Sequence, residues 1–161
     1  MEKAGLILLY AGKSIPKGWL PCDGRLLKVR DNRLLYSIIG NKYGGNISDD
    51  TFGLPKRDNV NKLRYIICPD GEFIGSSLTY TFDPNDENRT IGFVLPFEGG
   101  NVPDGWVLCD GKQLINYQDE TLYAAFGDTF NTTSTAANNF CLPKTDKPHI
   151  VCVSGDFPSP Y

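Results

Sequence analysis

Short apolar runs separated by turn residues make up most of the hydrophobic pattern of this chain. Residues 6–10 and 93–97 form two such runs, and residues 65–68 and 149–152 form two more. Apolar runs of roughly four to eight residues with turn signals at their ends are typical of strands buried in a sheet. We therefore predict a core built from short β-strands.

A helical pattern of apolar positions occurs twice, at 31–40 and at 118–127. In the first segment the leucine and isoleucine side chains fall on one helical face, Asp31 stands at a capping position, and Gly40 stands where a helix can end. The second segment has the same form. We predict one short helix at each place, so the fold class is α+β and β-rich.

The two halves of the chain repeat one another. Residues 5–40 align without a gap on residues 92–127 at an offset of 87, and thirteen of the thirty-six pairs are identical. The identical pairs include both tryptophans, Trp19 and Trp106. Self-similarity over this length predicts two tandem, pseudo-symmetric modules with the same fold.

The repeat divides the chain into three parts. We predict a first module at 1–68, a structured connector at 69–91, and a second module with a C-terminal tail at 92–161. Each module is small, and a domain of about 60 residues buries only about 60% of the surface that its unfolded chain exposes. We therefore expect the two modules to pack together into one compact body.

An Asp-Gly pair stands at the same place in both modules, as Asp23-Gly24 and as Asp110-Gly111. Between β-prone segments this pair is a strong signal for a two-residue hairpin, because a type I′ turn needs positive φ at both central residues. We predict an Asp-Gly hairpin in each module. Turn formation explains both aspartates, so we assign neither a catalytic role.

The tryptophans and cysteines of this motif are matched as well. Trp19 and Trp106 lie inside predicted strands, where packing in the core is the more common fate of the side chain. Cys22 and Cys109 belong to a set of five cysteines without a C-x-x-C spacing. We expect buried free thiols, no zinc site within one chain and no cofactor.

One set of residues could be drawn as a thiol-protease site, namely Asp146, His149 and Cys152. If 149–152 is a strand, however, side chains three positions apart point to opposite faces. We therefore predict that the protein is not an enzyme. The single histidine leaves open one metal site, in which three copies would each supply an imidazole around a trimer axis.

Charge and hydropathy exclude some partners. A net charge of -3 and a pI near 5.1 leave no basic footprint for a nucleic acid. The apolar stretch 4–11 is too short to cross a membrane and lacks the basic start of a signal peptide. We expect synthesis in the cytoplasm without a signal peptide, and no insertion into a membrane.

The order of these motifs resembles the phage tail collar domain family. The sequence Gly-Trp-Leu-Pro-Cys-Asp-Gly at 18–24 is followed by Tyr-Gly-Gly at 43–45 and by Thr-Phe-Gly-Leu-Pro at 51–55. The second half carries the same order between Gly92 and Pro143, without the glycine pair. The chain also has Lys-Arg-Asp-Asn at 56–59, where family members usually have an Asp-x-Arg-Gly-Arg-like stretch.

The resemblance implies a non-enzymatic structural protein. It would be a collar-like subunit of a phage tail, a tail-like injection particle or a bacterial cell-surface assembly, and it would act through contacts with other protein subunits. Family members are commonly trimeric, so a homo-trimer is one expected state. The final location would be a virion, a tail-like particle or the cell surface.

A second hypothesis is a carbohydrate- or receptor-binding module of the lectin or adhesin kind. Its binding loops would be 41–51 and 128–139, which are rich in polar residues. An exposed tryptophan in a concave surface would favour this hypothesis, because aromatic rings stack on sugars.

Several aromatic residues in the connector and the tail are not needed by either module. Left exposed, they would form an apolar patch of a kind that monomers rarely tolerate. We therefore expect them to lie on the neighbouring module, on another copy or on a host protein. They are Phe73, Tyr80 and Phe82 in the connector, and Phe157 and Tyr161 in the tail.

Overall fold

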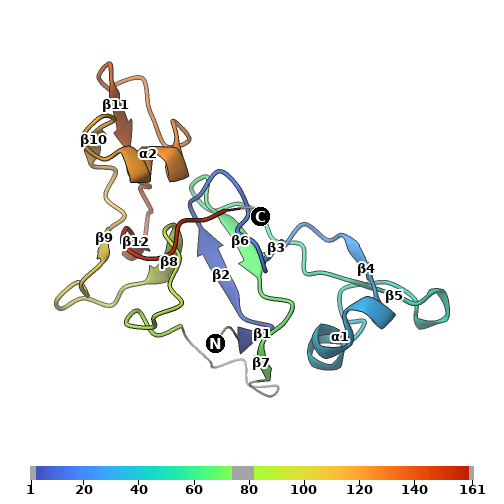
Figure 1. Cartoon of the computed structure of the whole chain (residues 1–161). Coiled ribbons are helices and arrows are strands. Elements are labelled where there is room, and N and C mark those ends of the chain that lie inside the picture. Colours follow the sequence, from blue (N-terminus) through green and yellow to red (C-terminus); the bar gives the residue numbers. More distant parts are fainter. Residues whose placement is uncertain (1–2, 74–81, 160–161) are drawn as a thin grey trace.

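The computed structural model of the chain describes residues 3–73 and 82–159 (Figure 1). Tyr80 and Tyr161, and the side chain of Phe73, lie outside this description. The elements in chain order are β1 (Lys3–Ala4), β2 (Ile7–Tyr10), β3 (Leu20–Pro21), β4 (Leu26–Lys28), a 3₁₀ turn (Val29–Asp31), α1 (Arg33–Ile39), a 3₁₀ turn (Ile47–Asp49), β5 (Thr51–Gly53), β6 (Arg64–Ile67), β7 (Glu72–Phe73), β8 (Phe93–Pro96), β9 (Trp106–Leu108), β10 (Gln113–Ile115), α2 (Glu120–Phe126), β11 (Asn139–Cys141) and β12 (His149–Cys152).

A six-stranded sheet forms the centre of the molecule. Its strand order is β3-β6-β2-β8-β12-β9, and every neighbouring pair is antiparallel. The first half of the chain supplies three adjacent strands and the second half supplies the other three. The halves meet where Leu9 of β2 lies opposite Val94 of β8. The two modules therefore share one sheet.

The pairing register is the same in both halves. Ile7 lies opposite Ile67 in the first half, and the equivalent Val94 lies opposite Val151 in the second. If the β2–β8 register is continued by one residue, Leu8 falls opposite Leu95, and these two residues are equivalent in the repeat. A pseudo-two-fold axis thus passes between the central strands. The prediction of two modules with one fold is confirmed.

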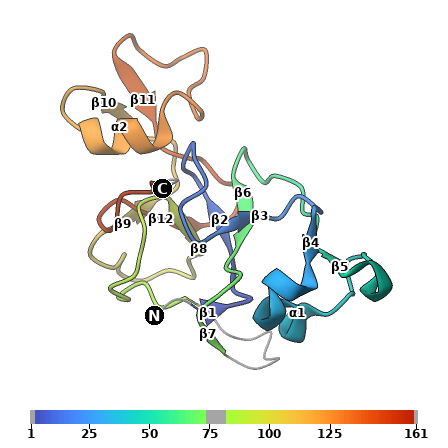
Figure 2. The ribbon, with the colours of Figure 1, turned by 45° about the vertical axis from the view of Figure 1, so that its right-hand side comes forward.

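Each half also forms a smaller unit beyond the sheet, which we call an arm. The first arm (22–57) contains α1 and the β4–β5 pair, and the second arm (109–145) contains α2 and the β10–β11 pair. Figures 1 and 2 show the arms on opposite sides of the central sheet. The modules do pack together, but the expectation of a compact body is wrong, because the two arms project outward from the sheet. The apolar side chains of each arm cluster with those of the sheet.

The predicted Asp-Gly hairpins are wrong. The strands that flank Asp23-Gly24 belong to different sheets, since β3 pairs with β6 and β4 pairs with β5. Gly24 and Gly111 have φ of 80° and 77°, but neither aspartate has a positive φ, as a type I′ turn requires. Each Asp-Gly is instead a corner where the chain leaves the central sheet and enters an arm. The strands on either side of the Asp-Gly pair gain more by pairing with β6 and β5, which buries apolar side chains, than by pairing with each other.

Both predicted helices are present, one in each arm. α1 begins at Arg33 after Asn32, so Asp31 is not its cap, and it ends at Gly40 with φ of 58°. α2 ends in the same way at Gly127, with φ of 59°. The short strands and short helices confirm the β-rich α+β fold class.

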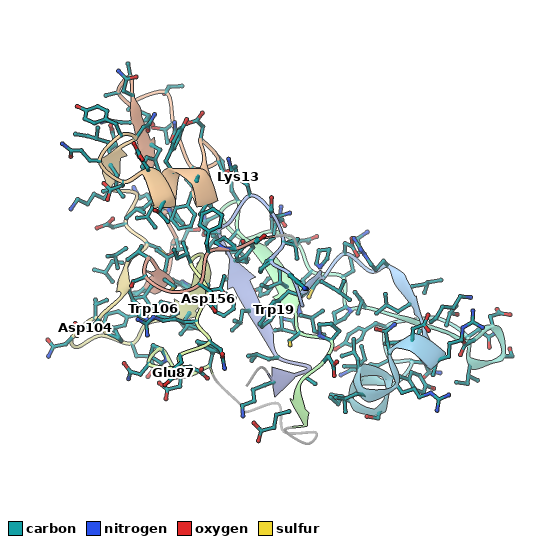
Figure 3. All side chains as sticks on the ribbon, in the orientation of Figure 1. Lys13, Trp19, Glu87, Asp104, Trp106 and Asp156 are labelled. Atoms are coloured by element: carbon teal, nitrogen blue, oxygen red, sulfur yellow. The ribbon has the colours of Figure 1, made fainter. Side chains whose placement is uncertain are left out.

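Both tryptophans are core residues. Trp19 is 6% exposed and Trp106 is 4% exposed, and both belong to one cluster on the central sheet (Figure 3). Trp19 meets the ring of Phe93 edge-on at a centroid distance of 5.3 Å, and Phe82 meets the same ring at 5.3 Å. Phe82 is therefore buried against β8 of the second module, which is one of the three places expected for it, so it does not belong to a surface for an external partner.

A loop of the first half also contacts the second arm. The backbone N–H of Lys13 donates to the carbonyl oxygen of Ala125 at 2.8 Å, which satisfies one carbonyl of α2 near its C-terminal end. Figure 3 shows Lys13 beside this helix. The equivalent residue of the second half is Gly100, where an added Cβ would have no neighbour within 4 Å. The second arm is thus held by both halves of the chain.

Candidate functional site

The Asp-Gly motif residues form the two joints between sheet and arms. Asp23 Oδ1 accepts a hydrogen bond from the backbone N–H of Arg25 at 3.1 Å, and Asp110 Oδ1 accepts one from Lys112 at 3.0 Å. The Arg25 guanidinium also pairs with the Asp23 carboxylate at 2.8 Å. Hydrogen bonding from Arg25 holds the pKa of Asp23 below its usual range. Both aspartates are therefore occupied in shaping a corner.

The glycine of each joint lies against a lysine. A Cβ added at Gly24 would be 3.2 Å from the Cβ of Lys56, and one added at Gly111 would be 3.2 Å from the Cβ of Lys144. Asp23 and Lys56 form an isolated antiparallel bridge, and Asp110 forms one with Lys144. The close approach and the positive φ explain why glycine stands at both positions.

The thiols of the motif are buried beside these joints. Burial raises the pKa of Cys22 to about 11 and that of Cys109 to about 12. The thiol of Cys68 donates to the Asp70 carbonyl at 2.9 Å, and the equivalent Cys152 donates to the Ser154 carbonyl at 3.3 Å. All five cysteines are buried, as expected. A thiol that stays protonated is a poor nucleophile.

The residues of the protease-like set do not come together. His149 Nδ1 lies 2.8 Å from the carbonyl oxygen of Lys147, and the Asp146 backbone faces Asn61. Cys152 is buried, and its thiol donates a hydrogen bond to the Ser154 carbonyl oxygen. Across residues 3–73 and 82–159, no group of three His, Cys, Asp or Glu side chains is placed to hold a metal ion.

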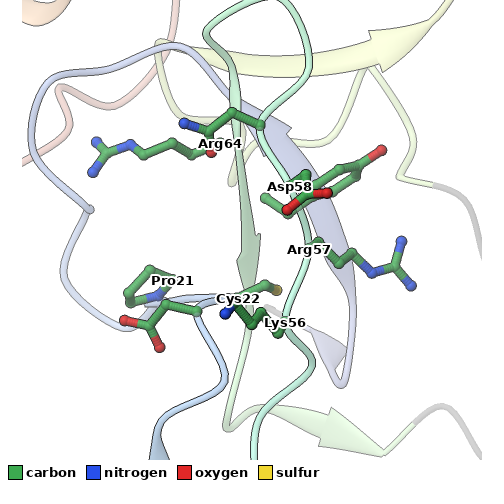
Figure 4. A pocket seen from close by; sticks show the side chains of 9 residues that line it. Pro21, Cys22, Lys56, Arg57, Asp58 and Arg64 are labelled. Carbon is green, nitrogen blue, oxygen red and sulfur yellow. The ribbon is translucent and has the colours of Figure 1, made fainter.

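A charged hollow lies where the first arm meets the sheet (Figure 4). Two of the cationic side chains that line it, Arg57 and Arg64, already interact with other groups of this protein. The Arg64 guanidinium donates to the carbonyl oxygens of Gly12 at 2.8 Å and Lys13 at 2.9 Å, and Arg57 lies over the ring of Tyr65 at 5.1 Å. In Figure 4 the Arg57 and Arg64 side chains point to opposite sides. Asp23 and Asp58 also line the hollow, so its net charge is small, and its cations do not converge on one ligand.

An apolar groove runs between the sheet and the second arm. We call it the second-arm groove, and its volume is about 450 Å³. Leu108, 41% exposed, lies on its surface, and Asp110 and Asp119 line it together with Lys112. The other apolar residues that line it are Val102, Trp106, Val107, Leu114, Leu122, Leu142 and Val153. This surface could receive an apolar side chain with a positive neighbour.

The first arm carries exposed apolar side chains, which we call the first-arm patch: Leu26, Tyr43 and Ile47. Leu26 is 59% exposed and Ile47 is 57% exposed. In the second arm the residue equivalent to Leu26 is Gln113, whose Oε1 accepts from the Ala136 backbone at 3.2 Å and from Asn139 at 3.1 Å. At this position the second arm has a side chain bonded to its own loop, whereas the first arm has an exposed apolar side chain.

Comparison with protein families gives one result. The model of the phage tail collar domain matches the chain twice, over residues 5–58 and 92–147. The chain belongs to the phage tail collar domain family. A comparison with curated proteins gives no match. The two collar repeats coincide with the two halves of the pseudo-symmetric fold, and each repeat contains one joint and one arm.

Membership of the collar family supports a structural role in a phage tail, together with a virion or tail-associated location. In the part of the chain that the structure describes, no helix has the length and apolar character needed to span a membrane. Of the five aromatic residues expected at a partner surface, Phe157 is exposed, at 49%.

Sequence reasoning did not identify the first-arm patch. Leu26 lies beside Leu27 in an apolar run, so nothing within the first collar repeat marks one of them as exposed. Comparison of the collar repeats does contain the signal, because Leu26 aligns with the polar Gln113 whereas Leu27 aligns with Leu114. A position that is polar in one copy and apolar in the other faces away from the core.

Proposed function

We propose that this protein is a structural subunit of a phage tail or a tail-like particle, and that it acts through contacts with other protein subunits. In this proposal residues 1–68 and 92–161 are the two collar repeats and 69–91 is the connector. The observation that carries it is the shared six-stranded sheet of two collar repeats. Such a sheet fixes two arms in a defined relation, which suits a part that must hold neighbours in place.

The described site residues support this role. The matched aspartates, glycines and lysines close the joints, and the tryptophans fill the core. What the chain offers to its surroundings is the outer surface of the arms and the tail, including the first-arm patch and Phe157. Exposed apolar side chains of this kind mark protein–protein contacts when they are grouped. Because Trp19 and Trp106 are buried, we do not propose the sugar-binding role.

The test is to ask whether the chain is part of a particle. Particles are purified on a density gradient from cells that produce a tagged chain, and the proteins that sediment with it are identified by mass spectrometry. The proposal predicts a fixed ratio between this chain and tail proteins in the particle fraction. If the chain stays at the top of the gradient while assembled tails sediment without it, the structural role is wrong.

A surface variant makes the test sharper. Phe157→Ala removes an exposed ring and should reduce the share of the chain found in particles, with little change in the free energy of unfolding. Tyr117→Ala is the comparison variant, because Tyr117 is an exposed aromatic residue of the second arm, at 68%. Equal incorporation of both variants would exclude Phe157 from the contact.

A further inference from the structure

Charge is distributed unequally along the chain. Residues 1–68 carry twelve Lys and Arg against six Asp and Glu, whereas residues 69–161 carry four against thirteen. The net charge of -3 conceals this difference. One half of the molecule is therefore strongly positive and the other strongly negative, although both halves have the same fold.

The difference arises partly from reversals at equivalent positions. Lys17 of the first half corresponds to Asp104 of the second, and Arg33 at the start of α1 corresponds to Glu120 at the start of α2. All four side chains are exposed. Figure 3 shows Asp104 at the outer edge of the second half, on the side of the molecule away from the first arm. Two surfaces with one backbone shape thus have opposite charge.

The arms are complementary in apolar surface as well. The first-arm patch presents Leu26, Tyr43 and Ile47, and Arg33 and Lys42 of the same arm are exposed. The Lys42 ammonium lies 5.6 Å from the centre of the Tyr43 ring, so a positive charge accompanies the patch. The first arm therefore combines protruding apolar side chains with positive charge.

The second-arm groove has the opposite features. It is mostly apolar inside, and the carboxylates of Asp110 and Asp119 stand on it. Asp119 precedes α2, but its side chain does not cap the helix. Glu120 is exposed next to it, and Lys112 is the cation that lines the groove. A positive, apolar protrusion fits this groove by both charge and hydrophobicity.

The patch and the groove of one chain lie on arms that extend on opposite sides of the sheet (Figures 1 and 2). We propose that the first arm of one copy docks into the second-arm groove of another copy, in a head-to-tail contact. The contact joins two different surfaces, so it repeats from copy to copy and closes into a ring or continues as a filament. This inference rests on the structural role proposed above and names a second copy of the chain as a partner.

Two charge-reversed variants of the whole chain test the contact. Arg33→Glu with Lys42→Glu changes the first arm only, and Asp119→Lys with Glu120→Lys changes the second arm only. Because like charges then face each other, each variant alone should lose self-association by roughly tenfold or more. Mixed in equal amounts, the two variants keep one intact pair of surfaces and gain a second pair in which both charges are reversed and again opposite, so assembly should be restored.

Sedimentation velocity measures these states. Wild-type assembly should weaken as salt rises, since the Debye length falls from about 30 Å at 0.01 M to about 3 Å at 1 M. Leu26→Gln copies the residue of the second arm and should weaken assembly at both salt concentrations. Lys62→Glu with Lys147→Glu is the matched control, because it makes the same charge change at exposed positions outside both arms, and it should assemble like wild type. Tryptophan fluorescence shows that each variant is folded.

The contact is overturned if the wild-type chain is monomeric at low salt, if either arm variant assembles like wild type, or if the control loses assembly as far as the arm variants do. It is also overturned if the mixed variants assemble no further than either variant alone. A monomeric chain that is nevertheless found in particles would remove this contact and leave the structural role in place.

Discussion

Gly53 and Cys141 are equivalent residues with different neighbours, and they show how one fold uses two sequences. In the first arm the Gly53 N–H donates to the Gly44 carbonyl at 3.0 Å, and a Cβ at Gly53 would collide with the carbonyl oxygen of Tyr43. In the second arm the Cys141 N–H donates to the side chain of Asn131 at 2.9 Å. Asn131 is the equivalent of Gly44, so a side-chain oxygen replaces a backbone oxygen. This replacement explains why the glycine pair is missing from the second repeat.

The first prediction concerns this pair. Gly53→Ala should lower the free energy of unfolding by about 1–3 kcal/mol, because the new methyl group forces the loop at Tyr43 away from β5. Cys141→Ala is the matched control, since that site already holds a Cβ, and its loss should be smaller. Urea denaturation of both variants measures the difference. An equal or smaller loss for Gly53→Ala would contradict the described path of the loop.

The second prediction concerns pH. Burial raises the pKa of Cys22 to about 11 and that of Cys109 to about 12, and it also raises the pKa of Cys152. Unfolded thiols lose their protons near about pH 8.5. Above that pH the native state therefore binds more protons than the unfolded state, so the free energy of unfolding should fall as the pH rises toward 11.

Denaturant titrations between pH 7 and 10.5 measure this slope. Replacing Cys22 and Cys109 together by alanine should make the slope shallower above about pH 8.5 and leave it unchanged below. Cys152 and Tyr10, whose pKa values burial also raises, supply the slope that remains. A double variant with the wild-type slope would mean that these thiols titrate normally in the native protein.

At the scale of elements, local signals located the strands and helices but not their partners. The apolar runs predicted the positions of β2, β6, β8 and β12, because a short apolar run between turn residues is itself the signal of a buried strand. The prediction of Asp-Gly hairpins failed because the same two residues can form either the turn of a hairpin or a corner between two sheets. The outcome depends on whether β3 pairs with β4, which is nearby in the chain, or with β6, which is more than forty residues away. A local pattern carries no information about that choice.

The third prediction concerns the packing of the connector on the central strands. The indole Nε1 of Trp106 donates to the Pro84 carbonyl at 2.8 Å, and Phe82 packs on Phe93 of β8. Trp106→Ala should lower the free energy of unfolding by about 3–5 kcal/mol through the cavity that it leaves. Tyr117→Ala, on the exposed face of the second arm, should change it by less than about 0.5 kcal/mol. Equal thermal melts for the two variants would refute the buried position of Trp106.

At the scale of the whole molecule, the sequence predicted two packed modules but not their shared sheet. The offset of 87 established two copies, and their small size favoured contact between them. The β2–β8 pairing that joins them is an edge-to-edge contact between two equivalent strands. Neither strand differs in pattern from one that packs face to face, so only the structure reveals it.

The candidate surface was only partly predictable. Phe82 was expected on the neighbouring module, on another copy or on a host protein, and it is buried within the chain against the second module. The sequence left this choice open, because an aromatic residue outside a module can equally meet a partner or fill the gap between modules. The opposite net charges of the two halves can be predicted from the sequence once the repeats are compared position by position. A total over the whole chain conceals them, since positive and negative halves nearly cancel.

The central claim is that two collar repeats form one body through the shared sheet. Native-state amide hydrogen exchange tests it most directly, because amides that open only in global unfolding report a common free energy. The account predicts that β6 of the first repeat and β12 of the second exchange with the same free energy, together with β2 and β8, and that this value equals the global free energy of unfolding. Two separate values, one for each repeat, would show that the halves unfold independently and would contradict the account.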